Sequence, residues 1–258
     1  MPALAMQPVM ISEVGRRENN EDAVFASPRL VAVADGVGGA VAGEIASRLT
    51  IHKVMALDKR RLVRSLEEEL EDMVADANAV IGFAAWCQPL YAGMASTLTA
   101  VALSNDGAYL VANVGDSRTY LMRDEHLRQL TRDDSLVQEL IDQGLLSDAE
   151  ASRHPHRSVV VEVLDGVARP LPALQSVHAR EGDRLLLCSD GVTDYLTDAE
   201  VTELLRIEDA HAAVRRLVAS ALDHGSRDNV TALIADLVAS TDSRDGWLGA
   251  LPTAGHRV

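Results

Sequence analysis

The chain has 258 residues, of which 47% are hydrophobic and 24% are charged, so it can form one large domain or two small ones. Its formal net charge of -15 argues against nucleic-acid binding, which relies on Lys and Arg to neutralise phosphates. No apolar run approaches the roughly 18–20 residues that span a bilayer, and residues 1–9 lack the basic and apolar segments of a signal peptide. We therefore expect a soluble, cytoplasmic and monomeric protein, without nucleic-acid or membrane partners.

Short apolar runs bounded by Gly, Asp or Asn are typical of β-strands. They predict strands, in chain order, over residues 30–34, 97–103, 108–114, 117–122, 184–188 and 230–237. Asn105-Asp106-Gly107 predicts a hairpin between the second and third of them. Apolar residues at helical spacing predict helices over residues 42–57, 59–84, 133–143, 197–205 and 209–222. Strands joined by short turns, with helices grouped between them, favour an α+β fold over alternating βαβ units.

Acidic residues stand at the ends of three of these predicted strands. Asp35 follows residues 30–34 in the motif Asp35-Gly36-Val37-Gly38-Gly39, Asp190 follows residues 184–188, and Asp228 precedes residues 230–237. Each motif alone is most simply a turn, because Gly permits sharp changes of backbone direction. Together they suggest carboxylates that converge at one edge of a sheet, where they repel one another unless a cation lies among them. Oxygen ligands without a His–Cys cluster favour Mg²⁺ or Mn²⁺ over Zn²⁺.

A further acidic motif, Arg17-x-x-Asn20-Glu21-Asp22, contains an arginine. It is compatible with a surface ion pair, which contributes little to stability. Alternatively, Glu21 and Asp22 serve the metal ions while the guanidinium of Arg17 binds a phosphate with two hydrogen bonds. Asp116, in Gly115-Asp116-Ser117-Arg118, adds another carboxylate.

Taken in order, these motifs resemble those of the metal-dependent Ser/Thr protein phosphatases of the PPM (PP2C-like) family, in particular a compact bacterial type. The resemblance extends over about residues 10–238, and the ordered set is more specific than any one motif. The matching stretches are Arg17-x-x-Asn20-Glu21-Asp22, Asp35-Gly36-Val37-Gly38-Gly39, Gly93-Met94-x-x-Thr97-Leu98, Val114-Gly115-Asp116-Ser117-Arg118, Leu130-Thr131-Arg132-Asp133, Ser189-Asp190-Gly191-Val192-x-Asp194 and Arg227-Asp228-Asn229-Val230-Thr231.

The resemblance implies an α+β fold in the form of a four-layer αββα sandwich, with two packed antiparallel sheets flanked by helix pairs. It implies a phosphatase domain over residues 8–238, which includes a flap-like excursion over residues 145–172. Residues 239–258 are rich in small and polar side chains, and we expect them to form a flexible tail.

The resemblance also implies which residues hold two catalytic Mn²⁺ or Mg²⁺ ions. Asp35 would bridge both ions, and Gly36 would offer its carbonyl oxygen. Asp190 and Asp228 would hold the first ion. The two ions would share a water molecule and lower its pKa toward neutrality, so that the resulting hydroxide attacks phosphorus in line without a covalent phosphoenzyme.

The remaining motif residues would complete the site. Glu21 and Asp22 would contact the ions directly or through water, and which of the two does so stays open. Asp116, with Asp190, would hold the third ion that bacterial members contain. Arg17 would bind the substrate phosphate and offset its charge. The implied substrates are phosphoserine and phosphothreonine proteins that a cognate bacterial Ser/Thr kinase modifies.

The chain departs from the family pattern at several positions. Val37 stands where many eukaryotic members carry a His that is often proposed as the general acid, so metal-bound water would protonate the leaving group. Ser158 stands where the flap usually has Asn, and Asp134 stands where His is frequent. His154 and His156 are further flap candidates for a catalytic role, although solvated loop histidines are the simpler interpretation.

Other functions fit the motifs less well. A thiol-based phosphatase needs Cys-x5-Arg, but the Arg position is Gly93 after Cys87 and Asp194 after Cys188. A metal-dependent nuclease is disfavoured by the acidic charge and the lack of a basic stripe. Two alternatives with the same fold stay open: a partner-switching phosphatase of an anti-sigma antagonist, and a non-catalytic pseudophosphatase that only binds phosphoproteins. The second would have lost an Asp ligand, and the three at the strand ends are all present.

Overall fold

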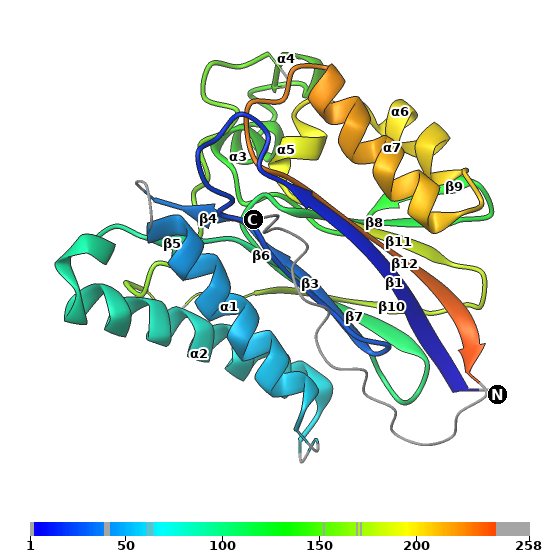
Figure 1. The fold of residues 1–258 in the computed structure, drawn as a ribbon, viewed down its shortest axis with the longest axis horizontal. Helices are drawn as coiled ribbons and strands as arrows, with labels where there is room; N and C mark the ends of the chain where they lie inside the picture. Colours follow the sequence, from blue (N-terminus) through cyan, green and yellow to red (C-terminus); the bar gives the residue numbers. More distant parts are fainter. Residues whose placement is uncertain are drawn as a thin grey trace.

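Two five-stranded antiparallel sheets lie face to face in the centre of the molecule (Figure 1). The computed structural model describes residues 3–38, 42–60, 62, 64–151, 153–168, 170 and 172–240. The first sheet has the order β1 (Ala3–Glu13), β12 (Val230–Ser240), β11 (Arg184–Cys188), β8 (Arg118–Arg123) and β9 (His126–Gln129). The second has the order β10 (Ala173–His178), β7 (Ala108–Val114), β6 (Leu98–Leu103), β3 (Leu30–Ala34) and β2 (Ala23–Ala26). A separate two-stranded ladder joins β4 (Gly36–Val37) to β5 (Ala95–Ser96).

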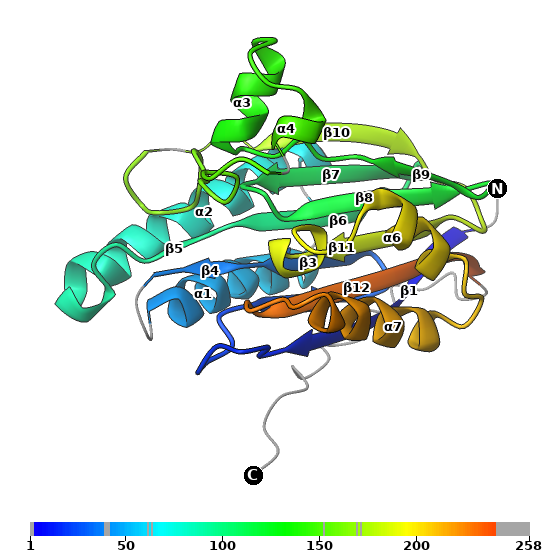
Figure 2. The same cartoon turned by 90° about the horizontal axis from the view of Figure 1, so that it is seen from above.

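Helix pairs cover the outer face of each sheet (Figures 1 and 2). Helices α1 (Ala42–Asp58) and α2 (Leu66–Cys87) pack on the second sheet, whereas α6 (Asp198–Leu205) and α7 (Ala210–Asp223) pack on the first. The shorter helices are the 3-10 turn η1 (Pro89–Tyr91), α3 (Leu136–Asp142), α4 (Asp148–Ala151) and α5 (Asp190–Thr193). Within the described residues, no helix is both long and apolar enough to traverse a lipid bilayer.

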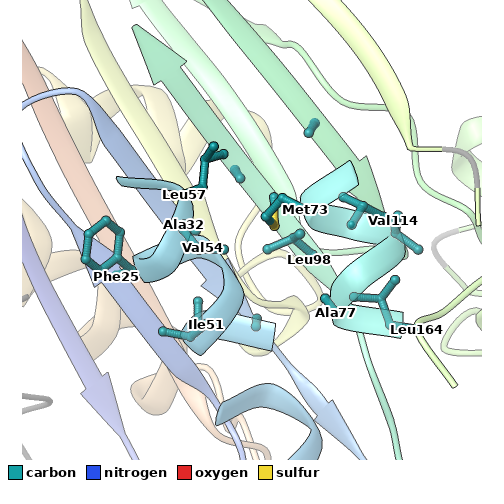
Figure 3. Packing of buried hydrophobic residues seen from close by; sticks show 14 of the residues in the cluster. Phe25, Ala32, Ile51, Val54, Leu57, Met73, Ala77, Leu98, Val114 and Leu164 are labelled. Atoms are coloured by element: carbon teal, nitrogen blue, oxygen red, sulfur yellow. The ribbon is translucent and has the colours of Figure 1, made fainter. Parts of the chain in front are cut away.

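Buried side chains fill the three interfaces between these four layers. In β11, Leu185 and Leu187 enter the cluster between the sheets, while Leu186 and Cys188 enter the cluster beneath α6 and α7. Side chains alternate along a strand, and both faces of this strand are covered, so its residues after Arg184 are all apolar. Figure 3 shows the third cluster, where Val54 of α1 and Met73 of α2 face the second sheet. The structure confirms the expected α+β sandwich of two antiparallel sheets flanked by helix pairs.

Within the two five-stranded sheets, the described strands that the sequence did not predict are β1, β2, β9 and β10, which are the edge strands. The short strands β4 and β5 were not predicted either. An edge strand has one neighbour, so it tolerates polar residues and proline. Accordingly, β1 contains Pro8, and most side chains of β10 are exposed. Strands β1, β9 and β10 therefore lack the continuous apolar pattern that identified the central ones, whereas β2 is apolar and buried but only 4 residues long.

The boundaries of several elements also differ from the prediction. Helix α2 begins at Leu66, rather than near residue 59, because Ser65 and Glu68 form a capping box there. The sheet extends beyond the expected domain of residues 8–238, since Ala3 of β1 pairs with Ser240 of β12. Residues 239–240 thus belong to a strand, and the rest of the predicted tail, residues 241–258, lies outside the described residues.

Candidate active site

Asp35 directly follows β3, at the end where the β4–β5 ladder begins. Its amide donates a hydrogen bond to Thr97 Oγ1 (3.0 Å), and the amide of Thr97 donates to the Asp35 carbonyl oxygen (2.8 Å). The Thr97 hydroxyl also contacts Ser117 Oγ at 2.8 Å. The backbone of Asp35 is therefore held on both sides, so the position of its carboxyl group is set by β3 and by the segment that leads into β6.

Glu21 and Gly36 meet the first turn of α1. The amide of Gly36 donates to the carbonyl oxygen of Glu21 at 3.2 Å. A Cβ atom at Gly43 would lie 2.8 Å from the Gly36 carbonyl oxygen and 2.9 Å from Glu21 Oε2, which is too close for a side chain. Glycine at this position therefore allows α1 to approach two oxygen atoms that are suited to a hard cation. Gly39, the last residue of the predicted motif, lies outside the described residues.

Asp22, the residue that follows Glu21, is buried. The Ser189 hydroxyl donates to Asp22 Oδ2 at 2.9 Å, and the Asp22 amide donates to Asn20 Oδ1 at 3.1 Å. Asp22 Oδ1 is buried and has no hydrogen-bond partner among the described residues. Burying a carboxylate oxygen without a donor is costly, so this atom is suited to a bound cation.

Asp190 opens the one-turn helix α5 just after β11. Its Oδ1 is a second buried oxygen that lacks a hydrogen-bond partner in the described part of the chain. A Cβ atom at Gly191 would lie 2.0 Å from the Asn229 carbonyl oxygen, so α5 is held tightly against the start of β12. Asp116 follows Gly115, whose φ of +100° favours glycine.

Asp228 lies two residues before β12 and pairs with Arg17, whose Nη2 donates to Asp228 Oδ2 at 2.7 Å. The adjacent Asn229 is buried and links distant segments. Its Oδ1 accepts a hydrogen bond from the Glu21 amide (2.8 Å), and its Nδ2 donates to the Val14 carbonyl oxygen (2.9 Å). Asn229 thus holds the loop that carries Arg17 and Glu21 against β12.

The carboxyl groups of this cluster raise one another's pKa values. Burial, the largest cause, raises the pKa of Asp22 to about 6 and that of Asp116 to about 7. The pKa of Asp35 lies well above its usual range because of burial and then the negative charge of Asp22 and Asp190. Asp190 behaves similarly, with burial followed by the charge of Asp116. A divalent cation would relieve this shared repulsion.

The structure brings together the six predicted acidic residues, and their donor atoms fit Mn²⁺ or Mg²⁺. These atoms are carboxylate oxygens together with the Gly36 carbonyl oxygen, which hard cations prefer. In the described part of the chain, no three His, Cys, Asp or Glu side chains already form a metal-ligand group. The fit therefore rests on the donor chemistry and on the two unpartnered oxygens, Asp22 Oδ1 and Asp190 Oδ1. The six residues are Glu21, Asp22, Asp35, Asp116, Asp190 and Asp228.

The predicted flap residues approach the cluster through Asp194. Ser158 Oγ donates to Asp194 Oδ2 at 3.4 Å, and Arg157 Nε lies 3.5 Å from the same oxygen. The rings of His154 and His156 are neighbours, with 5.7 Å between their centroids and an angle of 55° between their planes. Ser158 is thus connected to the acidic cluster, whereas the two histidines contact each other.

A cavity of about 610 Å³ lies beside the cluster. Asp116, Asp190 and Asp194 line it, together with Ala151 and Arg157 from the excursion. Its size is typical of a site for a small ligand or part of a peptide.

Sequence reasoning did not identify three residues that organise this site. Ser189 and Asn229 position the cluster through hydrogen bonds, and Asp194 connects it to the flap-like excursion. Each of them lies in a motif that also contains a candidate metal ligand. Their polar side chains within these motifs were therefore the signal that could have identified them. Their partners are remote in the sequence, which is why their roles were not predicted.

Comparison with known proteins identifies the family. Residues 12–237 match the protein phosphatase 2C family. The chain is 42% identical over 222 residues to the serine/threonine protein phosphatase PstP of Mycobacterium tuberculosis, which covers 86% of this chain and 43% of that protein. It is 32% identical over 239 residues to the serine/threonine phosphatase stp of Listeria innocua, which covers 89% of this chain and 94% of that protein. The chain therefore spans less than half the length of PstP.

Solved structures agree with the sequence matches. A crystal structure of M. tuberculosis PstP has a TM-score of 0.87 at 40% identity, covering 91% of this chain and 99% of that one. A structure of the PstP catalytic domain in complex with 2 manganese ions has a TM-score of 0.85 at 38% identity, covering 92% and 100%. Sequence, fold and the ordered motifs thus agree, and the chain belongs to the protein phosphatase 2C family.

Proposed function

We propose that this protein is a metal-dependent phosphatase that hydrolyses phosphoserine and phosphothreonine in proteins. The observation that carries the proposal is the pair of buried oxygens, Asp22 Oδ1 and Asp190 Oδ1, which have no hydrogen-bond partner among the described residues. They lie in a carboxylate cluster that also contains the Arg17 guanidinium. The relatives named as serine/threonine phosphatases, and the PstP structure with manganese, support both the reaction and its dependence on metal.

Within this proposal, Asp35, Asp190 and Asp228 hold two Mn²⁺ or Mg²⁺ ions, and Asp116 with Asp190 holds a third. When bound, such ions supply Lewis acidity that activates water for attack on phosphorus. Both members of the Glu21–Asp22 pair serve the site. Asp22 offers its unpartnered Oδ1, and Glu21 offers Oε2 beside the Gly36 carbonyl oxygen.

Arg17 is the residue that binds the substrate phosphate. A guanidinium presents five N–H donors in a planar fork, so Asp228 can orient one edge while phosphate accepts from another. Val37 is exposed on β4 and has no titratable group, so it cannot protonate the leaving group. We assign no catalytic role to His154 or His156, and we assign Ser158 to the positioning of the flap.

The substrates and partners follow from this chemistry. We infer that the substrates are phosphoproteins made by a cognate Ser/Thr kinase, and that the protein acts as a cytoplasmic monomer. A partner-switching phosphatase of an anti-sigma antagonist would use the same site and differ only in its substrate. A pseudophosphatase is the weaker alternative because Asp35, Asp190 and Asp228 are all in place.

The test measures hydrolysis of p-nitrophenyl phosphate and of a phosphothreonine peptide with and without Mn²⁺. We expect turnover with Mn²⁺, its loss on chelation, and a kcat at least about 10²-fold lower for Asp35→Asn and Asp228→Asn. Glu181→Gln is the matched control, because it neutralises an exposed carboxylate in the turn before β11. Near-normal turnover of both aspartate variants would refute the proposed site.

A further inference from the structure

The C-terminal half of α2 ends in an exposed apolar surface. Phe83 is 63% exposed, Trp86 is 81% exposed, and Leu90 in the following η1 turn is 82% exposed. The rings of Phe83 and Trp86 lie 6.1 Å apart between centroids. Val167, from the segment that crosses α2, is 87% exposed. We call Phe83, Trp86, Leu90 and Val167 the aromatic patch.

Three of the four patch residues, Phe83, Trp86 and Leu90, come from a stretch of sequence without charge. No Asp, Glu, Lys, Arg or His occurs between Asp76 and Asp106, although the whole chain has a formal net charge of -15. The chain has only 2 Phe and 2 Trp, and one of each is exposed in this patch. Large apolar side chains that gather on one surface are typical of an interaction site.

The aromatic patch is built on a rigid base. Gly82 of α2 and Gly166 lie in close contact, because a Cβ atom at Gly166 would fall 2.1 Å from the Gly82 Cα. Asn78 Oδ1 accepts a hydrogen bond from the Gly166 amide at 2.8 Å, and Asn78 Nδ2 donates to the Ala168 carbonyl oxygen. Val167 is therefore held against the helix rather than placed there by a loose loop.

The aromatic patch lies at the same end of the molecule as the candidate active site. The Tyr91 carbonyl oxygen at the end of η1 accepts a hydrogen bond from the Met94 amide at 3.1 Å, which turns the chain into β5. Ala95 of β5 pairs with Val37 of β4, which is 46% exposed and lies two residues after Asp35. Figures 1 and 2 both show the C-terminal end of α2 and the β4–β5 ladder at the same end of the molecule.

We propose that the aromatic patch docks an apolar segment of the phosphoprotein substrate while the phosphorylated residue occupies the acidic site. This inference rests on the proposed phosphatase function and adds a substrate preference to it. Val37 pairs with Ala95, which follows the η1 turn, and it lies two residues after Asp35. A substrate is therefore the occupant that would contact both the aromatic patch and the acidic site. The formal net charge of -15 would repel an anionic membrane, and two copies of this acidic chain would repel each other.

The experiment compares three substrates: p-nitrophenyl phosphate, a short phosphothreonine peptide of small polar residues, and a long phosphothreonine peptide flanked by Leu and Phe. In the double variant Trp86→Ala, Leu90→Ala we expect kcat/KM for the long peptide to fall about tenfold, through KM. We expect the other two substrates to be unaffected. Leu62→Ala, which removes an exposed leucine before α2, is the matched control and should leave all three unchanged.

The outcomes separate this proposal from the proposed function. Equal kcat/KM of the double variant and the wild type on the long peptide would overturn docking while leaving the phosphatase function intact. Failure of the wild type on p-nitrophenyl phosphate would instead refute the function, and fluorescence anisotropy of the labelled long peptide would then decide docking. A two-copy mass in light scattering, or binding to phosphatidylcholine vesicles, that the double variant abolishes would also overturn the substrate as occupant.

Discussion

Strand β11 has an aspartate at each end, and the two ends satisfy their carboxyl groups differently. Before the strand, Asp183 accepts hydrogen bonds from Arg123 Nε and Nη2 (both 2.6 Å), from the Arg180 amide (2.8 Å) and from the Tyr109 hydroxyl (3.2 Å). After the strand, Asp190 keeps a buried oxygen without a hydrogen-bond partner among the described residues. The described residues thus donate hydrogen bonds to both carboxylate oxygens of Asp183 but none to Asp190 Oδ1.

This difference separates a structural carboxylate from a functional one. The Arg123 guanidinium compensates the charge of Asp183, so folding alone satisfies that end. At the other end the pKa of Asp190 is raised by burial and then by the charges of Asp116 and Asp194, which a bound cation would offset. The same strand therefore joins an end that stabilises the fold to an end that we propose binds metal.

The largest expected effect separates the two ends by activity. We expect Asp190→Asn to lower kcat for p-nitrophenyl phosphate with Mn²⁺ by about 10²–10³-fold, because it removes a proposed metal ligand. Asp183→Asn should keep kcat near the wild-type value in the folded fraction. A comparable loss of kcat in both variants would abolish the distinction between the ends.

The second effect concerns stability, for which we expect Asp183→Asn to be more damaging than Asp190→Asn. We expect Asp183→Asn to lower the free energy of unfolding by about 3 kcal/mol in urea titrations, because it leaves the Arg123 charge partly buried and unpaired. Without metal, Asp190→Asn should be neutral or stabilising, since it removes one negative charge from the cluster. Asp236→Asn should cost less than Asp183→Asn, because the Asp236 carboxylate is more exposed than that of Asp183 and its partner Arg184 keeps backbone carbonyl acceptors.

The third effect is the response to metal. At a hundredfold excess over its Kd, Mn²⁺ should stabilise the wild type by about 3 kcal/mol, which corresponds to a rise in Tm of about 5–10 °C. Differential scanning fluorimetry should show the same rise for Asp183→Asn and a smaller one for Asp190→Asn. A wild-type Tm that chelation leaves unchanged would argue against convergence of the carboxylates on a cation.

The smallest effect concerns Asp58, a buried aspartate that represents an intermediate case. Its Oδ1 accepts a hydrogen bond from the Ser27 hydroxyl at 2.7 Å, and burial raises its pKa to about 6. Because the folded pKa exceeds the unfolded value of roughly 3.9, this group contributes stability below pH 4 that is lost as the pH rises through about 6.

We expect this loss to be about 2 kcal/mol between pH 4 and pH 7. The measurement is the difference in unfolding free energy between the wild type and Asp58→Asn at each pH, in which contributions from the acidic cluster cancel. If that difference does not change with pH, Asp58 is not a titrating group of this kind.

The central strands and helices were predictable because their signals are local. Residues 108–114 and 184–188 were predicted with the bounds that β7 and β11 have in the structure, since both faces of these strands are covered and the runs are mostly apolar. The edge strands were not predicted, because an edge strand depends on its neighbour more than on its own composition. Strand β1, with Pro8, is a strand because it pairs along its length with β12.

The same distinction between local signals and tertiary contacts applies to the candidate site. The sequence by itself determined which acidic residues stand at strand ends and turns, because the alternation of apolar runs and turn residues is local chemistry. Only the tertiary structure decided that Asp22 Oδ1 and Asp190 Oδ1 are buried without a hydrogen-bond partner among the described residues. It alone placed the Glu21 amide on Asn229, although the two residues are 208 positions apart. The physical reason is that burial and hydrogen-bond satisfaction depend on groups that meet only when the chain has folded.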